Sequence, residues 1–288
     1  MRTQIDLLKQ YGLEIRGMLG QHLLIDPNVQ RKTIEPLELS PGDWVFEIGP
    51  GLGALTAPML ARGARVLAVE KDPRFVGVLE EIFAEEMREG KFLLEKGDIL
   101  EADLPALWKK HGVSRPARIA GNLPYYITAP ILFQIFEHRG LFSRGVFTIQ
   151  QEVAARMFAG PGTQDYGRLS VMVRLFSDVT HAFDISPQCF TPQPKVRSSV
   201  VICDFRRRPI PGGKAREQFL MAFVKAAFSQ RRKKLVTVLA RHAEFEKSKE
   251  GWAAVFRRLG LSEDTRAEEL LLKDFMALAD AAGASGGD

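Results

Sequence analysis

The chain has 288 residues, of which 45% are hydrophobic, and its formal net charge is +5. This length predicts one large domain and a smaller one, and the composition is that of a globular protein with an ample core. No run approaches the roughly 18 apolar residues of a membrane span, and the first residues lack the apolar stretch of a signal peptide, so we expect a cytoplasmic protein. Only Cys189 and Cys203 are present, which excludes a disulfide scaffold and gives no zinc-binding spacing.

From residue 44, short β-branched runs alternate with longer helical patterns, which is typical of βαβ units and a parallel sheet. The expected strands are 44–49, 65–70, 92–98, 117–123 and 145–150, and helical patterns between them include 73–87 and 129–139. Two further long strands, at 168–185 and 197–205, are expected to pair as an antiparallel hairpin at one edge. The predicted fold class is an α/β, Rossmann-like sheet of the methyltransferase type, parallel with an antiparallel edge hairpin.

The last part of the chain is expected to be a separate helical domain. A basic segment rich in proline and glycine, residues 206–214, precedes helical patterns at 215–230, 231–243, 251–260 and 265–282. We therefore predict a catalytic domain at 1–206 and a small helical domain at 207–288.

Positive charge is concentrated in this C-terminal part. Residues 206–288 contain 17 Lys and Arg against 11 Asp and Glu, whereas the rest of the chain contains 23 against 24. An RNA or DNA backbone is the expected partner of such a surface. The candidate contacts are Arg231, Arg232, Lys233 and Lys234, helped by Arg206, Arg207 and Arg208, and the alternative is a solvated helix end.

The segment EIGPGLGALT (47–56) joins the first strand to a helix through glycines that let backbone amides approach a ligand. Gly49, Gly51 and Ala54 also match a dinucleotide fingerprint. Gly53 and Glu47 favour a methyltransferase instead. A carboxylate beside the loop is unsuited to a pyrophosphate but suits the sulfonium cation of S-adenosylmethionine.

Two strand ends would hold the rest of this cofactor. Glu70 ends the second strand and is placed to accept hydrogen bonds from both ribose hydroxyls. Asp98 ends the third strand and is placed to meet the adenine amine, although it could instead cap the next helix. The expected cofactor is S-adenosylmethionine.

The fourth strand ends in GNLPYY (121–126), beside the expected position of the cofactor's methyl group. If the Asn122 side-chain oxygen and the Leu123 carbonyl both accept from an exocyclic amine, they aim its nitrogen lone pair at the methyl carbon. Pro124 fixes the backbone, and Tyr125 is expected to stack on a flipped base. Tyr126 is expected to pack.

The sequence resembles the ribosomal RNA small-subunit adenine N6,N6-dimethyltransferases, the KsgA family, over nearly its whole length. The shared segments are GQHLLID, EIGPGLGALT, VEKD, GDIL, GNLPYYI, YGRLSV, CFTPQPKVRSSVV and AFSQRRKKL. The resemblance implies transfer of two methyl groups to N6 of each of two adjacent adenosines in a hairpin near the 3′ end of small-subunit (16S) rRNA. We expect a monomer without metal or membrane, and we expect the rRNA to be met within an immature 30S particle, with naked RNA as the alternative.

The resemblance further implies that the cofactor site is lined by His22, Leu24, Gly49, Glu70, Asp98 and Asn122. Phe190 would stack on the target base opposite Tyr125. The family usually has Asn where this chain has His22, whose ring can still donate to the methionine carboxylate.

Three other functions fit parts of the pattern. A large-subunit rRNA methyltransferase that confers antibiotic resistance shares the N-terminal motifs, but YGRLSV and AFSQRRK resemble the small-subunit enzymes. A non-catalytic assembly or transcription factor of the same fold is disfavoured by the intact Glu70, Asp98, Asn122 and Tyr125. A dehydrogenase is disfavoured because no acid for hydride transfer is apparent.

Overall fold

The computed structural model describes residues 3–15, 22–113, 116–205 and 210–283. Contacts divide the chain into two compact units. The first unit holds residues 1–154 and 177–207, and the second holds residues 155–176 and 208–288. The second unit thus includes 155–176, a segment that the predicted division at 206/207 assigned to the catalytic domain. The start of the predicted linker, including Arg206, Arg207 and Arg208, lies outside the described residues.

The first unit is built on a seven-stranded sheet with the order β4-β3-β2-β5-β6-β9-β7. Its strands are β2 (Trp44–Ile48), β3 (Arg65–Glu70), β4 (Phe92–Lys96), β5 (Ala117–Asn122), β6 (Phe142–Gln150), β7 (Ser177–Ile185) and β9 (Ser198–Phe205). The first five strands in this order pair in parallel, and β9 pairs antiparallel with both β6 and β7. The predicted Rossmann-like sheet with an antiparallel edge hairpin is confirmed.

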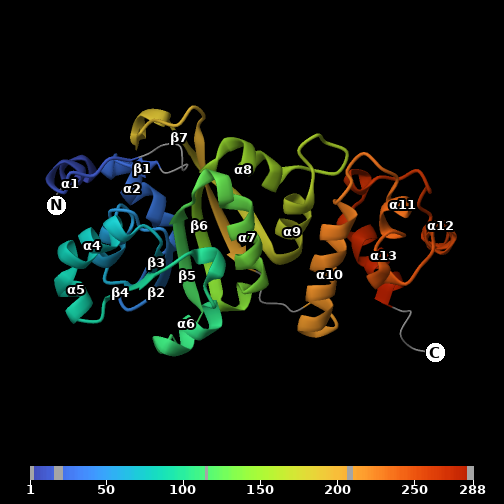
Figure 1. Ribbon diagram of the computed structural model, residues 1–288, viewed down its shortest axis with the longest axis horizontal. Coiled ribbons are helices and arrows are strands. Elements are labelled where there is room, and N and C mark those ends of the chain that lie inside the picture. Colours follow the sequence, from blue (N-terminus) through green and yellow to red (C-terminus); the bar gives the residue numbers. More distant parts are fainter. Residues whose placement is uncertain (1–2, 16–21, 114–115, 206–209, 284–288) are drawn as a thin grey trace. The chain divides into compact units, whose positions relative to one another are not determined.

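Helices cover both faces of this sheet (Figure 1). The helices of the first unit are α1 (Gln4–Gln10), α2 (Pro27–Ile34), α3 (Thr56–Ala61), α4 (Pro73–Ile82), α5 (Ala84–Arg88), α6 (Leu104–Lys110), α7 (Thr128–Glu137) and the start of α8 (Gln151–Phe158). All five residues of β2 are buried, as expected for a central strand of a parallel sheet. Val45 packs among Ile34 and Met59 on one face, and Phe46 contacts Trp108 on the other.

A separate two-stranded sheet joins distant parts of this unit. It pairs β1 (Leu23–Leu24) antiparallel with β8 (Phe190–Thr191), so that Leu24 lies opposite Phe190. His22 therefore lies close to Pro192, and its Nδ1 is 2.6 Å from the Pro192 carbonyl oxygen. Because a carbonyl only accepts, Nδ1 is the donor.

The predicted long strand at 168–185 is wrong in its first half. Residues Arg168–Phe176 form helix α9, and only Ser177–Ile185 form β7. Seven of the nine α9 residues are buried, and short runs rich in apolar residues do not distinguish helix from strand by period alone. Its valines favoured the strand reading, and tertiary burial overrode that preference.

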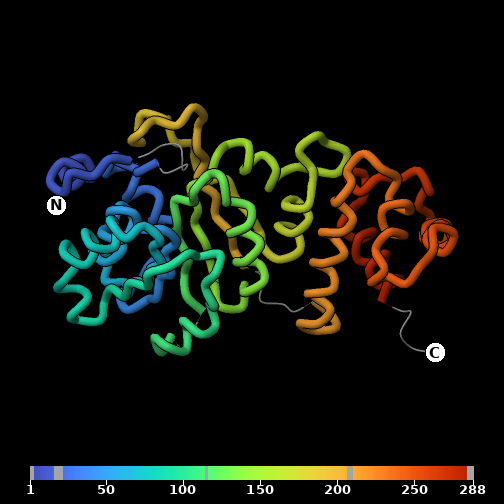
Figure 2. Tube along the Cα trace, in the orientation of Figure 1, coloured from blue at the N-terminus to red at the C-terminus, as the bar shows by residue number. Residues whose placement is uncertain are grey.

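The second unit is helical, with α9, α10 (Gly213–Ala227), α11 (Leu235–Leu239), α12 (Lys249–Arg258) and α13 (Leu272–Gly283). Figure 2 shows residues 168–176 running beside α10, in agreement with their contacts. Phe223, Phe245 and Trp252 form an aromatic cluster in its core. The predicted helix at 231–243 is shorter than expected, because residues 231–234 form turns and a bend before α11. In the described ranges, no helix combines the length and apolarity needed to cross a membrane.

Candidate active site and cofactor pocket

A pocket of about 80 Å³ lies at the edge where the carboxyl ends of β2, β3 and β5 meet. This edge is where open α/β sheets bind their ligands. Its lining residues are His22, Leu23, Gly49, Gly51, Glu70, Phe75, Asn122, Leu123, Pro124 and Tyr125. The structure thus brings together the glycine loop, Glu70, which was predicted to bind the ribose, and the GNLPY segment.

Gly51 shows why the loop requires glycine. Its φ of +59° lies in the left-handed region, and a Cβ there would stand 3.0 Å from the Leu23 side chain. The amide of Gly51 donates to Glu70 Oε2 at 3.0 Å, and the amide of Asp72 donates to Glu70 Oε1 at 2.8 Å. Glu70 therefore anchors the loop through both of its carboxylate oxygens.

Glu70 is 6% exposed, and burial raises the pKa of its carboxyl above the ordinary range. Desolvation disfavours the charged form, and hydrogen bonds from the amides of Asp72, Gly51 and Lys71 offset only part of this effect. The group therefore becomes protonated at a higher pH than a surface glutamate does.

Glu47 is a buried side chain of the loop motif. It is 1% exposed, is absent from the pocket lining, and accepts a hydrogen bond from Thr56 Oγ1 at 2.6 Å. Burial raises its pKa to about 8, so the protonated form predominates at neutral pH. The attraction between a Glu47 carboxylate and a sulfonium cation therefore stays a prediction, and Glu47 lies outside the pocket lining.

The Glu47→Gln variant is expected to flatten the pH dependence of stability. Because the folded-state pKa is raised from 4.5 to about 8, this group contributes stability that is fully present below pH 4.5 and is lost as the pH rises through 8. The wild type should lose up to about 1.4 kcal/mol of unfolding free energy per pH unit in this window. Urea titrations between pH 5 and 9 measure it, with the exposed Glu80→Gln as control. Parallel profiles for wild type and Glu47→Gln would contradict the assignment.

Asp98 follows β4 and caps the 3-10 turn Ile99–Glu101, where its side chain accepts from the Leu100 amide at 2.9 Å. Its second oxygen is 2.6 Å from Lys71 Nζ. The hydrogen bond from Lys71 is the main cause that holds the pKa of Asp98 below its usual value. The capping alternative is thus realised, and Lys71 is a partner that the sequence reading missed. Asp98 does not line the 80 Å³ pocket.

Asn122 is held by a contact from the opposite wall of the pocket. Its Nδ2 donates to the His22 carbonyl at 2.7 Å, which leaves Oδ1 as the free acceptor of the amide. The next amide, that of Leu123, donates to the Thr148 carbonyl at 3.0 Å. No donor in the described ranges reaches the Leu123 carbonyl. Two neighbouring acceptors are therefore available at the end of β5.

Tyr125 is fixed at both ends. Its hydroxyl is 2.6 Å from Ser198 Oγ in β9, and its ring lies 5.1 Å from the His22 ring at 31°. Ser198 was not singled out from the sequence, because nothing in RSSVV marks one serine as a partner of a tyrosine more than seventy residues earlier. Tyr126 is 62% exposed, so the expectation that it packs is wrong.

Comparison with known proteins gives one family. The model of the family described as ribosomal RNA adenine dimethylase matches residues 12–281. The chain belongs to the ribosomal RNA adenine dimethylase family. A relative from Geobacter metallireducens, named ribosomal RNA small subunit methyltransferase A, is 40% identical over 96% of this chain and 98% of the relative. A relative of the same name from Halothermothrix orenii is 38% identical over 96% of this chain and 90% of the relative.

Solved structures agree with this family assignment. The crystal structure of a dimethyladenosine transferase from Plasmodium falciparum covers 91% of this chain, with 98% of its own length matched, at 25% identity and a TM-score of 0.73. The 23S rRNA methyltransferase ErmE covers 91% of this chain and 99% of its own length at 23% identity and a TM-score of 0.62, which shows a shared fold. As a member of this family, the protein is an adenine dimethyltransferase that acts on ribosomal RNA. No group of acidic, histidine or cysteine side chains suited to a metal occurs among the described residues.

The side chains of two residues that the family resemblance placed at the site are buried in this structure. Phe190 and Leu24 are each 1% exposed and belong to the apolar cluster above the sheet. Leu23 lines the pocket in place of Leu24. The proposed stacking of a base between Phe190 and Tyr125 is not prepared in this structure, because pairing of β1 with β8 buries the Phe190 ring.

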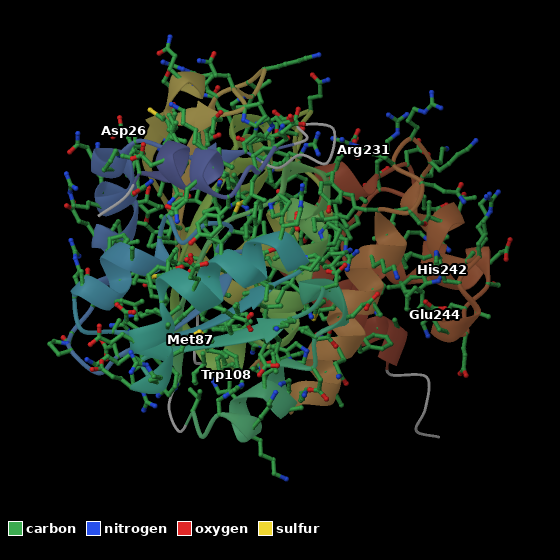
Figure 3. The ribbon with its side chains drawn as sticks, turned by 60° about the vertical axis from the view of Figure 1, so that its left-hand side comes forward. Asp26, Met87, Trp108, Arg231, His242 and Glu244 are labelled. Atoms are coloured by element: carbon green, nitrogen blue, oxygen red, sulfur yellow. The ribbon has the colours of Figure 1, made fainter. Side chains whose placement is uncertain are left out.

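The basic residues 231–234 are not equivalent. Arg231 (Figure 3) binds Glu268 Oε2 at 2.8 Å and the Tyr166 carbonyl at 2.9 Å, and it also donates to the Gln164 carbonyl. Lys234 forms an ion pair with Asp264. Arg232 and Lys233 are exposed, and neither has a carboxylate partner within the described part of the chain. Arg231 thus links the segment around Tyr166 to Glu268 within the second unit, and in the described ranges the positive charge without a carboxylate partner lies on Arg232 and Lys233.

Proposed function

We propose that this protein uses S-adenosylmethionine to dimethylate N6 of two adjacent adenosines in a hairpin near the 3′ end of small-subunit rRNA. The observation that carries the proposal is the pair of acceptors at the end of β5, Asn122 Oδ1 and the Leu123 carbonyl, in the pocket that Glu70 and Gly51 also line. The relatives named for the small ribosomal subunit support this RNA over that of the large subunit. We further propose that the substrate is an immature 30S particle and that the enzyme acts as a monomer in the cytoplasm.

The residues present fit the cofactor. Glu70 lines the pocket and is proposed to accept from the ribose hydroxyls, and Gly49 and Gly51 line the same pocket without side chains that would block a ligand. Asp98 is proposed to accept from the adenine amine, beside its contacts with Lys71 and Leu100. His22 and the backbone of Leu24 are proposed to bind the methionine end. When bound, S-adenosylmethionine supplies an electrophilic methyl group.

Catalysis is proposed to depend on positioning and electrostatics. The lone pair of an adenine N6 amine is delocalised into the ring, so the nitrogen is a weak nucleophile. Hydrogen bonds from its two protons to Asn122 Oδ1 and the Leu123 carbonyl favour tetrahedral geometry at nitrogen and direct the lone pair toward the methyl carbon. The hydrogen bond from Asn122 Nδ2 to the His22 carbonyl orients the amide for this role before substrate binds.

Tyr125 is proposed to stack on the flipped base. Its contact with Ser198 fixes the ring plane, which lowers the entropy lost on stacking. Phe190 is proposed as a second platform only if the β1–β8 pair opens. Tyr125→Ala should therefore cost catalysis far more than it costs overall RNA affinity, whereas Phe190→Ala should also destabilise the fold, because it empties a buried site.

The function is tested by incubating 30S particles that lack the modification with the protein and S-adenosylmethionine, followed by primer extension across the 3′ end of the rRNA. A strong stop at two adjacent adenosines is expected. A parallel incubation with 23S rRNA in place of the 30S particles tests the large-subunit alternative, and methylation of that RNA alone would favour it. Absence of methylation from both RNAs, with normal particle binding, would favour an assembly factor.

Arg232 and Lys233 are expected to account for part of the salt dependence of RNA binding. Replacing both with alanine should lower the slope of log affinity against log salt by about 0.7 to 0.9 for each lost phosphate contact. Arg231→Ala should instead lower the unfolding temperature, because it removes the ties to Glu268 and Tyr166. The matched control neutralises Lys249 and Arg258 of α12. If both double variants change the slope equally, the RNA responds to the overall positive charge of the second unit and not to phosphate contacts at Arg232 and Lys233.

A further inference from the structure

A second and larger hollow, of about 680 Å³, borders the glycine loop in the first unit. It meets the loop at Leu52 and Gly53, whereas the cofactor pocket meets it at Gly49 and Gly51. Residues of α1, α2 and α3 form its other walls, together with Ile82 and Phe83. This volume lies within the range of about 300–1,000 Å³ that is typical of small-molecule sites.

One polar side chain in this hollow lacks a partner. Gln4 is 6% exposed, and its Nε2 donates to the Leu52 carbonyl at 3.2 Å. Its Oε1 is fully buried and accepts no hydrogen bond from any residue that the structure describes. Buried acceptors are nearly always paired, because an unpaired one loses its hydration without replacement. An N–H or O–H group of a ligand would satisfy this oxygen.

The charged side chains that line the hollow are all positive. Arg31 and Arg62 line it and are exposed, and no aspartate or glutamate is among the lining residues. Arg31 binds Asn28 Oδ1 at 2.6 Å, and across the described ranges neither arginine pairs with a carboxylate. Most of the remaining wall is apolar, including Leu7, Ala57 and Pro58. An apolar body that carries an anionic group fits these features.

We propose that this hollow is a binding site for a small amphiphile with an apolar body, one hydrogen-bond donor and one anionic group. The donor meets Gln4 Oε1, the anion meets Arg31 and Arg62, and the body fills the apolar wall. Gln4 also holds the Leu52 carbonyl, so a ligand that contacts Gln4 acts on the loop that borders the cofactor pocket. The site therefore couples to cofactor affinity, a consequence that rests on the proposed function.

The probe is 8-anilinonaphthalene-1-sulfonate, which has an apolar body, one N–H donor and one anion. Its fluorescence is titrated with the full chain in saturating S-adenosylhomocysteine, so that the cofactor pocket is blocked. We expect one site per chain. Gln4→Met and Arg62→Gln should each weaken binding about fivefold, and Ala61→Phe, which places a ring in the hollow, should abolish it.

Arg88→Gln is the matched control, because Arg88 is an exposed arginine of the first unit that does not line the hollow. Circular dichroism verifies that each variant is folded. Neutral 1-anilinonaphthalene should bind the wild type more weakly than the sulfonate does. Its affinity for Arg62→Gln should equal its affinity for the wild type. No saturable binding, or equal binding of the sulfonate to wild type, Ala61→Phe and Arg62→Gln, would overturn the site.

Coupling is measured separately, as the calorimetric affinity for S-adenosylhomocysteine with and without the probe. A shift in the wild type that is absent from Ala61→Phe supports coupling through Leu52, and an unchanged affinity while the probe is bound overturns it. Probe binding needs no methyl transfer. Failure of the proposed function would therefore show in the ribosomal RNA assay and, if the cofactor assignment fails, as absent S-adenosylhomocysteine binding in the calorimetry, whereas failure of this site would show in the fluorescence titration.

Discussion

Asn122→Ala is expected to lower kcat for methyl transfer by roughly 10²–10³-fold, the range seen when one hydrogen-bonding group that acts in a transition state is removed. The variant loses the Oδ1 acceptor for the target amine, while the Leu123 carbonyl remains. Single-turnover incorporation of methyl groups into 30S particles measures the effect. Affinity for S-adenosylmethionine should stay within a few fold, because the ribose and adenine contacts are unchanged.

The control for this variant is Asn28→Ala, since Asn28 is the only other asparagine in the chain and is exposed on α2. It should leave turnover and cofactor affinity as they are. Near-normal single-turnover rates for Asn122→Ala would remove Asn122 from the catalytic role. A loss of cofactor affinity as large as the loss of rate would instead mean that its bond to the His22 carbonyl mainly shapes the cofactor pocket.

Glu70→Ala is expected to weaken S-adenosylmethionine binding about 10²-fold or more, because hydrogen bonds to a charged group contribute about 1.5–3 kcal/mol each. The variant also frees the Gly51 amide, so part of the loss comes from the loop. Isothermal titration calorimetry measures the affinity, and Glu80→Ala, at a surface ion pair with Lys96, is the control.

The pH dependence separates charge from loop anchoring. Burial raises the pKa of Glu70, so wild-type affinity should fall as the pH decreases through that raised value, at a higher pH than for an ordinary glutamate. In Glu70→Gln the affinity should be weaker but free of this step. Unchanged affinity in Glu70→Ala, or tight binding of NAD by the wild type, would overturn the cofactor assignment.

Features with a local cause could be predicted from the sequence. The strands β2, β3 and β5 follow from short β-branched runs, and the glycine loop follows from backbone angles that only glycine adopts at low cost, as at Gly51. Parallel strands bring their carboxyl ends to one edge, so the loop, Glu70 and Asn122 were expected to meet, and they do. Predicting these features required only the hydrophobic pattern of the sequence and the topology of a parallel sheet.

The rest was decided by residues far apart in the chain. Pairing of Leu24 with Phe190 buries both side chains, and Arg231 is bound by Glu268 and Tyr166. Burial raises the pKa of Glu47, and nothing in the sequence of the glycine loop motif indicates this burial. Burial, protonation and ion pairing depend on which distant groups exclude water or supply a partner, and only the tertiary structure determines those neighbours.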